Sequence, residues 1–174
     1  MSHLKAIIFV LSFVLSATLA NSHPAVTEGI KVGNKAPEII DNSVNGKPLK
    51  LSSLAGKIVL IDFWASWCRP CRNENPSVVA AYKKYKGVNF KGGKGFTVFS
   101  VSLDKDLNKW KEAITTDQLT WENHVCNPKV NSDYLRIYEI RFIPTSFLID
   151  GKGVILAVNP RGEALEKMLA SLKK

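Results

Sequence analysis

Chemical reactivity in this sequence is concentrated at Cys68 and Cys71. They stand in the string Trp-Cys-Arg-Pro-Cys, and two thiols this close can cycle between a dithiol and a disulfide. At the start of a helix, free backbone N–H groups and the helix dipole would stabilise a thiolate on the first cysteine. Arg69 adds a positive charge, and Pro70 suits a first helical turn because its missing N–H has no partner there. We therefore predict that Cys68 attacks a disulfide and that Cys71 resolves the mixed disulfide.

The same spacing also forms half of a zinc site, which is the alternative reading of the pair. A zinc site needs two further ligands, and only Cys126, His124 and distant histidines remain to supply them. The apolar run directly before the pair also disfavours a zinc-binding loop, so no metal is predicted. Cys126 is the odd cysteine, and we expect a buried, unreactive thiol there rather than a regulatory one.

The composition is that of an ordinary globular protein. The 174 residues are 45% hydrophobic and 22% charged, with a formal net charge of +9, which suits one packed domain. The positive excess comes from scattered lysines, whereas a nucleic-acid-binding surface usually gathers arginines and aromatic side chains on one face. The charge therefore predicts a solvated basic surface and no nucleic-acid partner. Attraction to anionic membranes or acidic partners is the functional alternative.

The first twenty residues have the pattern of a secretory signal peptide. Lys5 precedes an uncharged, mostly apolar run from residue 6 to residue 20, which ends in small residues. This run is shorter than the ~20 apolar residues that span a bilayer comfortably. We predict export to the periplasm and cleavage after Ala20; the alternative is an uncleaved leader that anchors the protein in the membrane. Residues 21–35 are expected to be a flexible lead-in, and residues 36–174 a single domain.

Hydrophobic patterning predicts the elements that would position the cysteine pair. Residues 58–64 form an apolar run interrupted only by Asp62, which is typical of a strand buried on both faces of a sheet. Turn signals at Asn45-Gly46 and Asp150-Gly151 mark two hairpins. The succession of strands and helices predicts an α/β fold with a mixed central sheet covered by helices on both faces. The expected elements are a hairpin around 45–48, strand 58–64, helix 70–86, strand 96–103, helix 109–116, an extended piece 121–125, helical turns 132–138, strands 147–149 and 154–158, and a final helix.

The segment from Phe63 to Cys71, Phe-Trp-Ala-Ser-Trp-Cys-Arg-Pro-Cys, resembles the active-site segment of thioredoxins. The wider pattern, from about Val32 to the C-terminus, resembles the TlpA/ResA-like group of exported thioredoxin-like reductases. This resemblance implies a thioredoxin fold with an N-terminal hairpin extension, a Cys68–Cys71 redox disulfide and no cofactor. The strings that carry it are Gly33-x-x-Ala-Pro37, Leu51-x-x-Leu-x-Gly-Lys57, Cys-Arg-Pro-Cys-Arg-Asn-Glu74-Asn-Pro76, Phe142-Ile-Pro-Thr145 and Phe147-Leu-Ile-Asp-x-x-Gly153.

The resemblance also implies roles outside the cysteine pair. Pro144 falls where this group has a cis proline facing the active cysteines, and the backbone before it, at Ile143, would pair with a substrate chain. Glu74 matches an acid that the group carries three residues after the second cysteine, and Asp62 matches the buried acid of the thioredoxin strand. Either carboxylate could take the proton of Cys71 during resolution, and the sequence leaves open which one does.

Two tryptophans frame the cysteine pair. Trp67 is expected to shield the reactive thiol and to offer an apolar platform to substrate, whereas Trp64 is expected to pack in the core. The residues expected to contact substrate are Trp67, Arg69, Pro70, Ile143 and Pro144.

The leading functional hypothesis is a thiol–disulfide oxidoreductase that keeps exported protein thiols reduced. The resemblance implies cytochrome c maturation as one use, and a membrane electron donor, because an oxidising compartment has no thiol buffer of its own. An exported disulfide oxidase or isomerase stays open as an alternative. A peroxiredoxin-like peroxidase is disfavoured because Ile61 and Ala65 stand where its pattern has Pro and Thr or Ser. A non-catalytic thioredoxin-fold adaptor is disfavoured by the intact cysteine pair.

Overall fold

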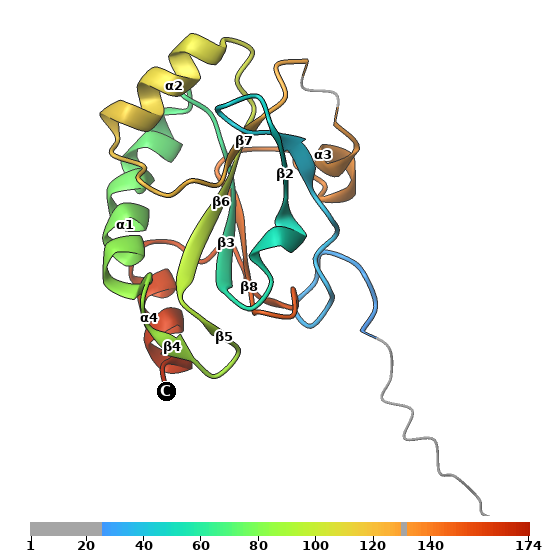
Figure 1. Ribbon diagram of the computed structural model, residues 1–174, viewed down its shortest axis with the longest axis vertical. Helices are drawn as coiled ribbons and strands as arrows, with labels where there is room; N and C mark the ends of the chain where they lie inside the picture. Colours follow the sequence, from blue (N-terminus) through green and yellow to red (C-terminus); the bar gives the residue numbers. More distant parts are fainter. Residues whose placement is uncertain (1–25, 130–131) are drawn as a thin grey trace, which may run out of the picture.

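A five-stranded mixed sheet runs through the centre of the protein in the computed structural model, which describes residues 26–129 and 132–174 (Figure 1). In spatial order the strands are β7 (His124–Cys126), β6 (Phe96–Ser102), β3 (Ile58–Trp64), β8 (Thr145–Ile149) and β9 (Ile155–Val158). β3 is parallel to β6 and antiparallel to β8; β7 and β9 are the two edge strands. The remaining elements are the hairpin strands β1 (Ile40–Asn42) and β2 (Pro48–Lys50), the hairpin strands β4 (Asn89–Phe90) and β5 (Gly93–Lys94), the 3₁₀ helix η1 (Leu51–Leu54), and the helices α1 (Arg69–Tyr85), α2 (Leu107–Thr116), α3 (Asp133–Ile137) and α4 (Gly162–Leu172).

The central strand β3 carries the cysteine pair at its carboxyl end. Six of its seven residues are buried, as expected for a mostly apolar strand in the middle of a sheet that is covered on both faces. Leu60 and Trp64 pack into the core beneath α1, whereas Ile61 and Phe63 pack into the core on the opposite face. The chain leaves β3, crosses through α1 and returns as the parallel strand β6. This connection places Cys68 between the end of the central strand and the start of a helix.

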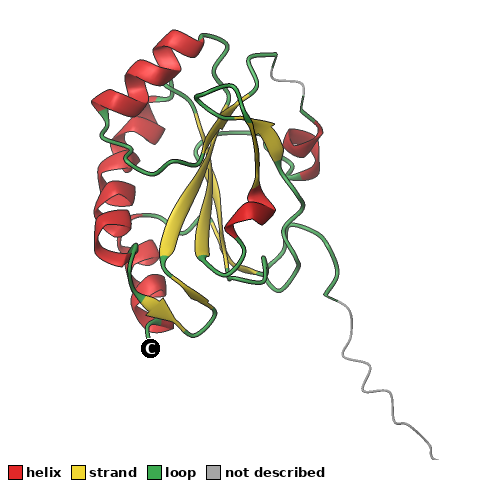
Figure 2. Ribbon diagram, in the orientation of Figure 1, coloured by secondary structure: helices red, strands yellow, loops and turns green. Residues whose placement is uncertain are grey.

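Helices cover both faces of the sheet, as the sequence predicts. α1, α2 and α4 lie together along one face, and α3, η1 and the β1–β2 hairpin lie along the other (Figures 1 and 2). On the second face, Leu51 and Leu54 of η1 pack with Tyr134 and Tyr138 against the sheet. The predicted fold class, a thioredoxin fold with an N-terminal hairpin, is therefore confirmed.

Ordered structure begins before the expected boundary at residue 36. The Gly33 N–H donates to the carbonyl of Ile155 in β9, and the Ile155 N–H donates to the carbonyl of Asn34, both at 2.9 Å. The end of the segment predicted to be a flexible lead-in, residues 21–35, is therefore hydrogen-bonded to β9, and the flexibility of that segment stays a prediction. Its backbone pairs with an edge strand that would otherwise have unpaired groups. A polar stretch without periodicity carries no local sign of such pairing.

The predicted signal peptide, residues 1–20, lies outside the described residues and stays a prediction. Within residues 26–129 and 132–174, no helix is both long enough and apolar enough to cross a membrane.

The Gly- and Lys-rich segment after α1 forms the β4–β5 hairpin, which packs against the C-terminus. Phe90 is buried, and the Lys91 N–H donates to the carbonyl of Leu172 at 2.9 Å. Gly95 has a φ of +82°, and a Cβ there would lie 2.7 Å from the carbonyl oxygen of Lys86, so glycine is required. The hairpin leads into the amino end of β6, and it therefore lies at the end of the sheet opposite the cysteine pair.

Candidate active site

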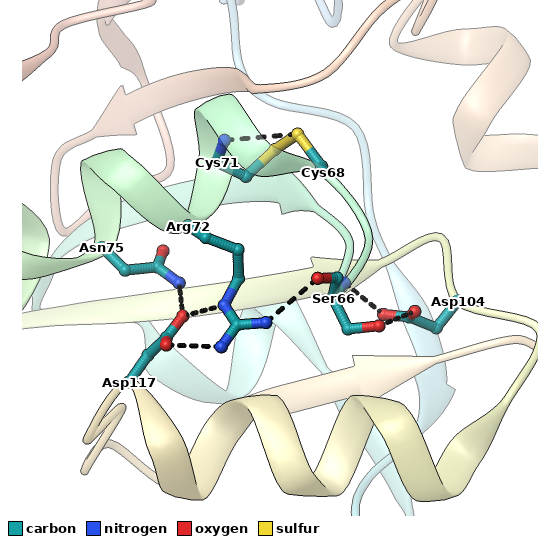
Figure 3. Close-up of polar contacts among 7 residues, drawn as sticks. All are labelled: Ser66, Cys68, Cys71, Arg72, Asn75, Asp104 and Asp117. Carbon is teal, nitrogen blue, oxygen red and sulfur yellow. Dashed lines mark hydrogen bonds and ion pairs between the residues drawn. A yellow bond between two sulfur atoms is a disulfide. The ribbon is translucent and has the colours of Figure 1, made fainter.

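The disulfide between Cys68 and Cys71 lies at the amino end of α1. Cys68 is the N-cap residue, and its Sγ accepts a hydrogen bond from the Cys71 backbone N–H at 3.3 Å (Figure 3). Sulfur thus takes the place that a Ser or Asp oxygen usually fills at an N-cap. Both cysteines are buried. After reduction of the disulfide, the same N–H and the helix dipole would stabilise a thiolate on Cys68.

Asp104, which follows β6, holds the loop that leads to Cys68. Its carboxylate accepts hydrogen bonds from the Ser66 backbone N–H at 2.9 Å and from the Ser66 hydroxyl at 2.6 Å (Figure 3). The Ser102 hydroxyl donates to the same carboxylate at 2.7 Å, and Asp104 is buried. One carboxylate therefore joins the loop after β3 to the loop after β6.

Arg72 holds the same loop from the helix side. Its Nη1 donates to the Ser66 carbonyl at 3.0 Å, while Nε and Nη2 both bond to the carboxylate of Asp117 (Figure 3). The Asn75 side-chain amide donates to Asp117 at 2.6 Å. Asp117 follows the end of α2, so this network joins α1, α2 and the active-site loop.

Asp62 lies on the face of β3 that packs beneath α1. It alternates with Leu60 and Trp64, which belong to that core, and it is the only residue of β3 that keeps partial solvent contact. Burial raises the pKa of Asp62 to about 7; Glu74 raises it further and Arg161 opposes the shift. A carboxyl with this pKa can both hold and release a proton near neutral pH.

Arg161 connects two of the predicted site residues. Its Nε lies 3.6 Å from the Glu74 Oε2, and its Nη2 donates a hydrogen bond to the carbonyl of Pro144. Burial raises the pKa of Glu74, and Arg161 opposes that shift. The Ile143–Pro144 peptide bond is cis, as the resemblance implies. The fold therefore brings Glu74, Asp62 and Pro144 to one site from three distant segments.

The surface next to the disulfide exposes apolar and basic side chains. Trp67 is 66% exposed, and Arg69 and Pro70 are exposed beside it. Trp64, by contrast, is completely buried in the core, as predicted. Trp67 is thus available to another molecule, whereas Trp64 is not.

The segment before the cis proline adds a second exposed aromatic ring and an open stretch of backbone. Phe142 is 65% exposed. Within the described part of the chain, neither the N–H nor the C=O of Ile143 makes a hydrogen bond, although the neighbouring Phe142 carbonyl accepts one from the Thr145 hydroxyl at 2.8 Å. Within the described residues, Ile143 therefore has an unpaired backbone donor and acceptor.

Residues 56–155 match the family model described as thioredoxin-like. The chain belongs to the thioredoxin-like family. Among its curated relatives, the thiol-disulfide oxidoreductase ResA of Bacillus subtilis (strain 168) is 31% identical over 153 residues, which cover 87% of this chain and 80% of the relative.

Solved structures agree with this assignment to the thioredoxin-like family. The thioredoxin domain of a thiol-disulfide oxidoreductase from Bacteroides vulgatus superposes with a TM-score of 0.75 at 32% identity, covering 84% of this chain and 100% of that domain. A structure described as a putative thiol:disulfide interchange protein DsbE, from Chlorobium tepidum, gives a TM-score of 0.68 at 35% identity, covering 83% of this chain and 99% of that one. This thioredoxin-like protein is therefore a thiol–disulfide oxidoreductase with a Cys68–Cys71 pair.

The third cysteine of this thioredoxin-like protein is buried, as predicted. The Cys126 Sγ donates to the carbonyl of Asp104 at 3.3 Å, and burial raises the pKa of the thiol to about 11. The nearby His124 is also buried, which lowers its pKa to about 4. At neutral pH both side chains are therefore uncharged, and the thiolate form of Cys126 is scarce.

Three important residues of the site were not predicted from the sequence: Arg161, Asp104 and Arg72. Asp104 and Arg72 act through partners that are 38 and 45 residues away along the chain, and no local pattern marks such contacts. The only signal at Arg161 was its place in Asn-Pro-Arg-Gly before the last helix. That string predicts a helix start and nothing more.

The raised pKa of Asp62 predicts a pH-dependent difference in stability between the wild type and Asp62→Asn. The unfolded chain releases this proton near 3.8, whereas the native state holds it up to about pH 7. The native state therefore loses stability as the pH rises from about 4 to 7. At pH 4 we expect Asp62→Asn to have the same free energy of unfolding as the wild type. At pH 8 the variant should be more stable than the wild type by about 2 kcal/mol. This is about half of the free energy that the whole pKa shift of Asp62 would give, because the carboxyl keeps some solvent contact.

Urea unfolding of both proteins at the two pH values measures this effect. Comparing the two proteins at each pH removes the contribution of the other titrating groups. An equal difference in stability at pH 4 and pH 8 would show that Asp62 titrates normally in the folded protein.

Proposed function

We propose that this protein reduces disulfide bonds of exported proteins, with Cys68 as the attacking thiolate and Cys71 as the resolving thiol. The observation that carries the proposal is the position of Cys68 at the amino end of α1, where its Sγ already accepts the Cys71 N–H. A thiolate formed there lies against a hydrogen-bond donor and the positive end of the helix dipole.

The reaction begins with the reduced dithiol. The Cys68 thiolate attacks one sulfur of a substrate disulfide, a mixed disulfide forms, and the other substrate sulfur leaves as a thiolate. The Cys71 thiolate then attacks Cys68 Sγ and releases the second substrate sulfur. The substrate gains two electrons, and the enzyme is left with the Cys68–Cys71 disulfide that is present here.

Resolution requires that Cys71 lose its proton. Two carboxyls are candidates for the base: Glu74, one turn further along α1, and Asp62, which faces α1 from β3. Burial raises the pKa of both groups, that of Asp62 to about 7. A base is most effective when its pKa lies near the working pH, which supports a role for a carboxyl of this kind.

A polypeptide substrate would lie across the exposed surface beside the disulfide. The unpaired N–H and C=O of Ile143 can bond to its backbone, as one strand adds to another. Trp67 and Phe142 offer apolar surface to its side chains. Arg69 and Pro70 are exposed beside the disulfide, and Pro144, itself buried, directly follows Ile143; these three residues complete the proposed substrate-binding set.

Export and electron supply complete the proposal. The pattern of residues 1–20 supports export to the periplasm, by cleavage or with the leader as an anchor. In an oxidising compartment the Cys68–Cys71 disulfide would need reduction by a membrane donor. Cytochrome c maturation is the use we propose, on the strength of the resemblance to the TlpA/ResA-like group.

The reduction potential of the Cys68–Cys71 pair is the experiment that tests the direction of electron flow. Equilibration of the protein with glutathione or dithiothreitol buffers measures it, with thiol alkylation to count the reduced form. We expect a value near or below about −230 mV, toward the thioredoxin end of the known scale. A value near about −120 mV would instead make the protein an oxidant or isomerase. A pair that does not cycle would leave only an adaptor role.

A further inference from the structure

The Arg161 guanidinium contacts two separate parts of the active site. Arg161 precedes α4, and its Nη2 donates to the carbonyl of Pro144 while its Nε lies 3.6 Å from the Glu74 carboxylate. A guanidinium presents several donors in a rigid planar arrangement, so it can hold two partners at once. No other side chain in the described part of the chain bonds to the Pro144 carbonyl.

The backbone around Arg161 is itself held in place. The Asn159 N–H donates to the Ser146 carbonyl at 2.7 Å, and the Ser146 N–H donates to the Asn159 Oδ1 at 2.9 Å. On the other side, the Arg161 carbonyl accepts from the Ala164 N–H at 2.9 Å in the first turn of α4. Arg161 therefore projects from a segment anchored on both sides, and its two contacts are not those of a loose surface arginine.

The partial burial of Glu74 and Arg161 strengthens the attraction between them. The Glu74 side chain is 18% exposed and the Arg161 side chain 40% exposed, so solvent screens their attraction less than at an open surface. The charged groups that meet here are Asp62 from β3, Glu74 from α1 and Arg161 before α4; Cys71 is the titratable thiol beside them on α1. Arg161 is the cation that opposes the effect of burial on both carboxyls.

We propose that Arg161 is a positioning residue that ties the Pro144 segment to Glu74, and so keeps the substrate-binding backbone and the acid near Cys71 in one arrangement. This inference rests on the proposed function, in which Ile143 binds the substrate chain and a carboxyl takes the Cys71 proton. Arg161 bonds to the Pro144 carbonyl and not to Ile143, whose N–H and C=O have no partner among the described residues. The Ile143 backbone therefore stays open to the substrate chain. Because Arg161 also meets Glu74, the same side chain favours the carboxylate form of the base.

Two consequences follow from removal of the guanidinium. The Pro144 segment loses its bond to the rest of the site, so the KM for a polypeptide disulfide should rise, whereas a small disulfide that does not use the Ile143 backbone should be little affected. The two carboxyls also lose their nearby cation. Their protonated forms become more favourable, and the acidic limb of the pH profile should move to higher pH.

The test compares Arg161→Gln and Arg161→Lys with the wild type in the full chain. The protein is first reduced with dithiothreitol, which is then removed, so that the Cys68–Cys71 dithiol supplies the two electrons. The probes are insulin, as a polypeptide disulfide, and 5,5′-dithiobis(2-nitrobenzoate), as a small one. The dependence of the single-turnover rate on probe concentration, from pH 5 to pH 9, gives kcat and KM. For Arg161→Gln we expect a KM for insulin raised about tenfold, since roughly one charge-assisted contact is lost. The acidic limb should move up by about one pH unit. The KM for the small disulfide should stay within about twofold.

Arg161→Lys keeps the charge but lacks the planar set of donors. We expect it to keep most of the wild-type acidic limb and still to show a raised KM for insulin, because an ammonium group cannot hold both partners. The matched control is Arg136→Gln on α3, which removes an exposed arginine paired with Asp133 at 3.9 Å. This control should match the wild type in both KM and pH profile.

The outcomes separate this inference from the proposed function. A wild-type protein that reduces neither probe would overturn the proposed function itself. An active wild type together with an Arg161→Gln protein of unchanged KM and pH profile would overturn the role of Arg161 alone. If Arg161→Gln does not fold, Arg161→Lys decides: an unchanged KM for insulin in that variant contradicts the positioning role. In a Glu74→Gln background, the shift of the acidic limb caused by Arg161→Gln should shrink, which a purely structural role does not predict.

Discussion

Replacing Cys71 by serine is expected to leave this protein joined to its substrates through a stable mixed disulfide. The first attack needs only the Cys68 thiolate, whose place at the amino end of α1 does not depend on the Cys71 side chain. Release of the substrate needs a second thiolate, and serine has no sulfur: its hydroxyl stays protonated at neutral pH and cannot form a disulfide with Cys68. Turnover should therefore fall at least about a thousandfold. Non-reducing gels followed by mass spectrometry of the trapped species measure the outcome.

Two matched variants are the controls for this trapping experiment. Cys68→Ser/Cys71→Ser should trap nothing and should be inactive, because it lacks the attacking sulfur. Cys126→Ser should cycle within about twofold of the wild type, because its buried thiol, with a pKa of about 11, stays protonated. Adducts that persist in the double variant would show that Cys68 is not the attacking residue. Absence of adducts in Cys71→Ser would favour an adaptor.

Replacing Asp104 by alanine should cause the largest loss of stability among the polar residues of the site. Its buried carboxylate accepts the Ser66 N–H, the Ser66 hydroxyl and the Ser102 hydroxyl, at 2.9, 2.6 and 2.7 Å. Alanine leaves these donors without that acceptor; the Ser102 hydroxyl is buried, and Ser66 is partly buried. Buried unsatisfied groups and a lost charged acceptor together predict a decrease in the free energy of unfolding of about 3 kcal/mol. Urea unfolding of the oxidised proteins measures it.

Milder changes at the same place act as controls. Ser66→Ala removes one donor and leaves the carboxylate with its other partners, so we expect a loss of about 1 kcal/mol. Asp104→Asn keeps one acceptor oxygen and should lie between the two. If Asp104→Ala were no less stable than Ser66→Ala, the carboxylate would not be the group that holds the active-site loop.

The reactive pair and its local setting could be predicted from the sequence because they depend on neighbouring residues. The apolar run of β3, the two cysteines and the proline at the start of α1 lie within fourteen consecutive positions, 58–71. Strand burial, helix start and cysteine spacing all leave short-range patterns. The fold class followed from the order of such patterns, and the buried state of Cys126 from its residue type.

The arrangement around the pair could not be predicted, because it is made by contacts between distant segments. The end of the presumed lead-in pairs with β9, and Asp104 holds Ser66 across 38 positions. Asp62 and Glu74 were predicted as candidate acids, but their raised pKa values arise from burial in the folded protein. Burial is a property of the assembled core and not of any one segment.

Arg161 shows most clearly the difference between what the sequence determines and what only the tertiary structure decides. Its sequence neighbours mark only the start of α4, while its partners, Glu74 and the Pro144 carbonyl, come from α1 and from the segment before β8. By itself the sequence determined the chemistry available to this protein, a dithiol at a helix start, because that chemistry is local. Only the tertiary structure decided which carboxyls, which arginine and which stretch of backbone meet it, because a charge or hydrogen bond acts over a few ångströms of space, whatever the separation along the chain.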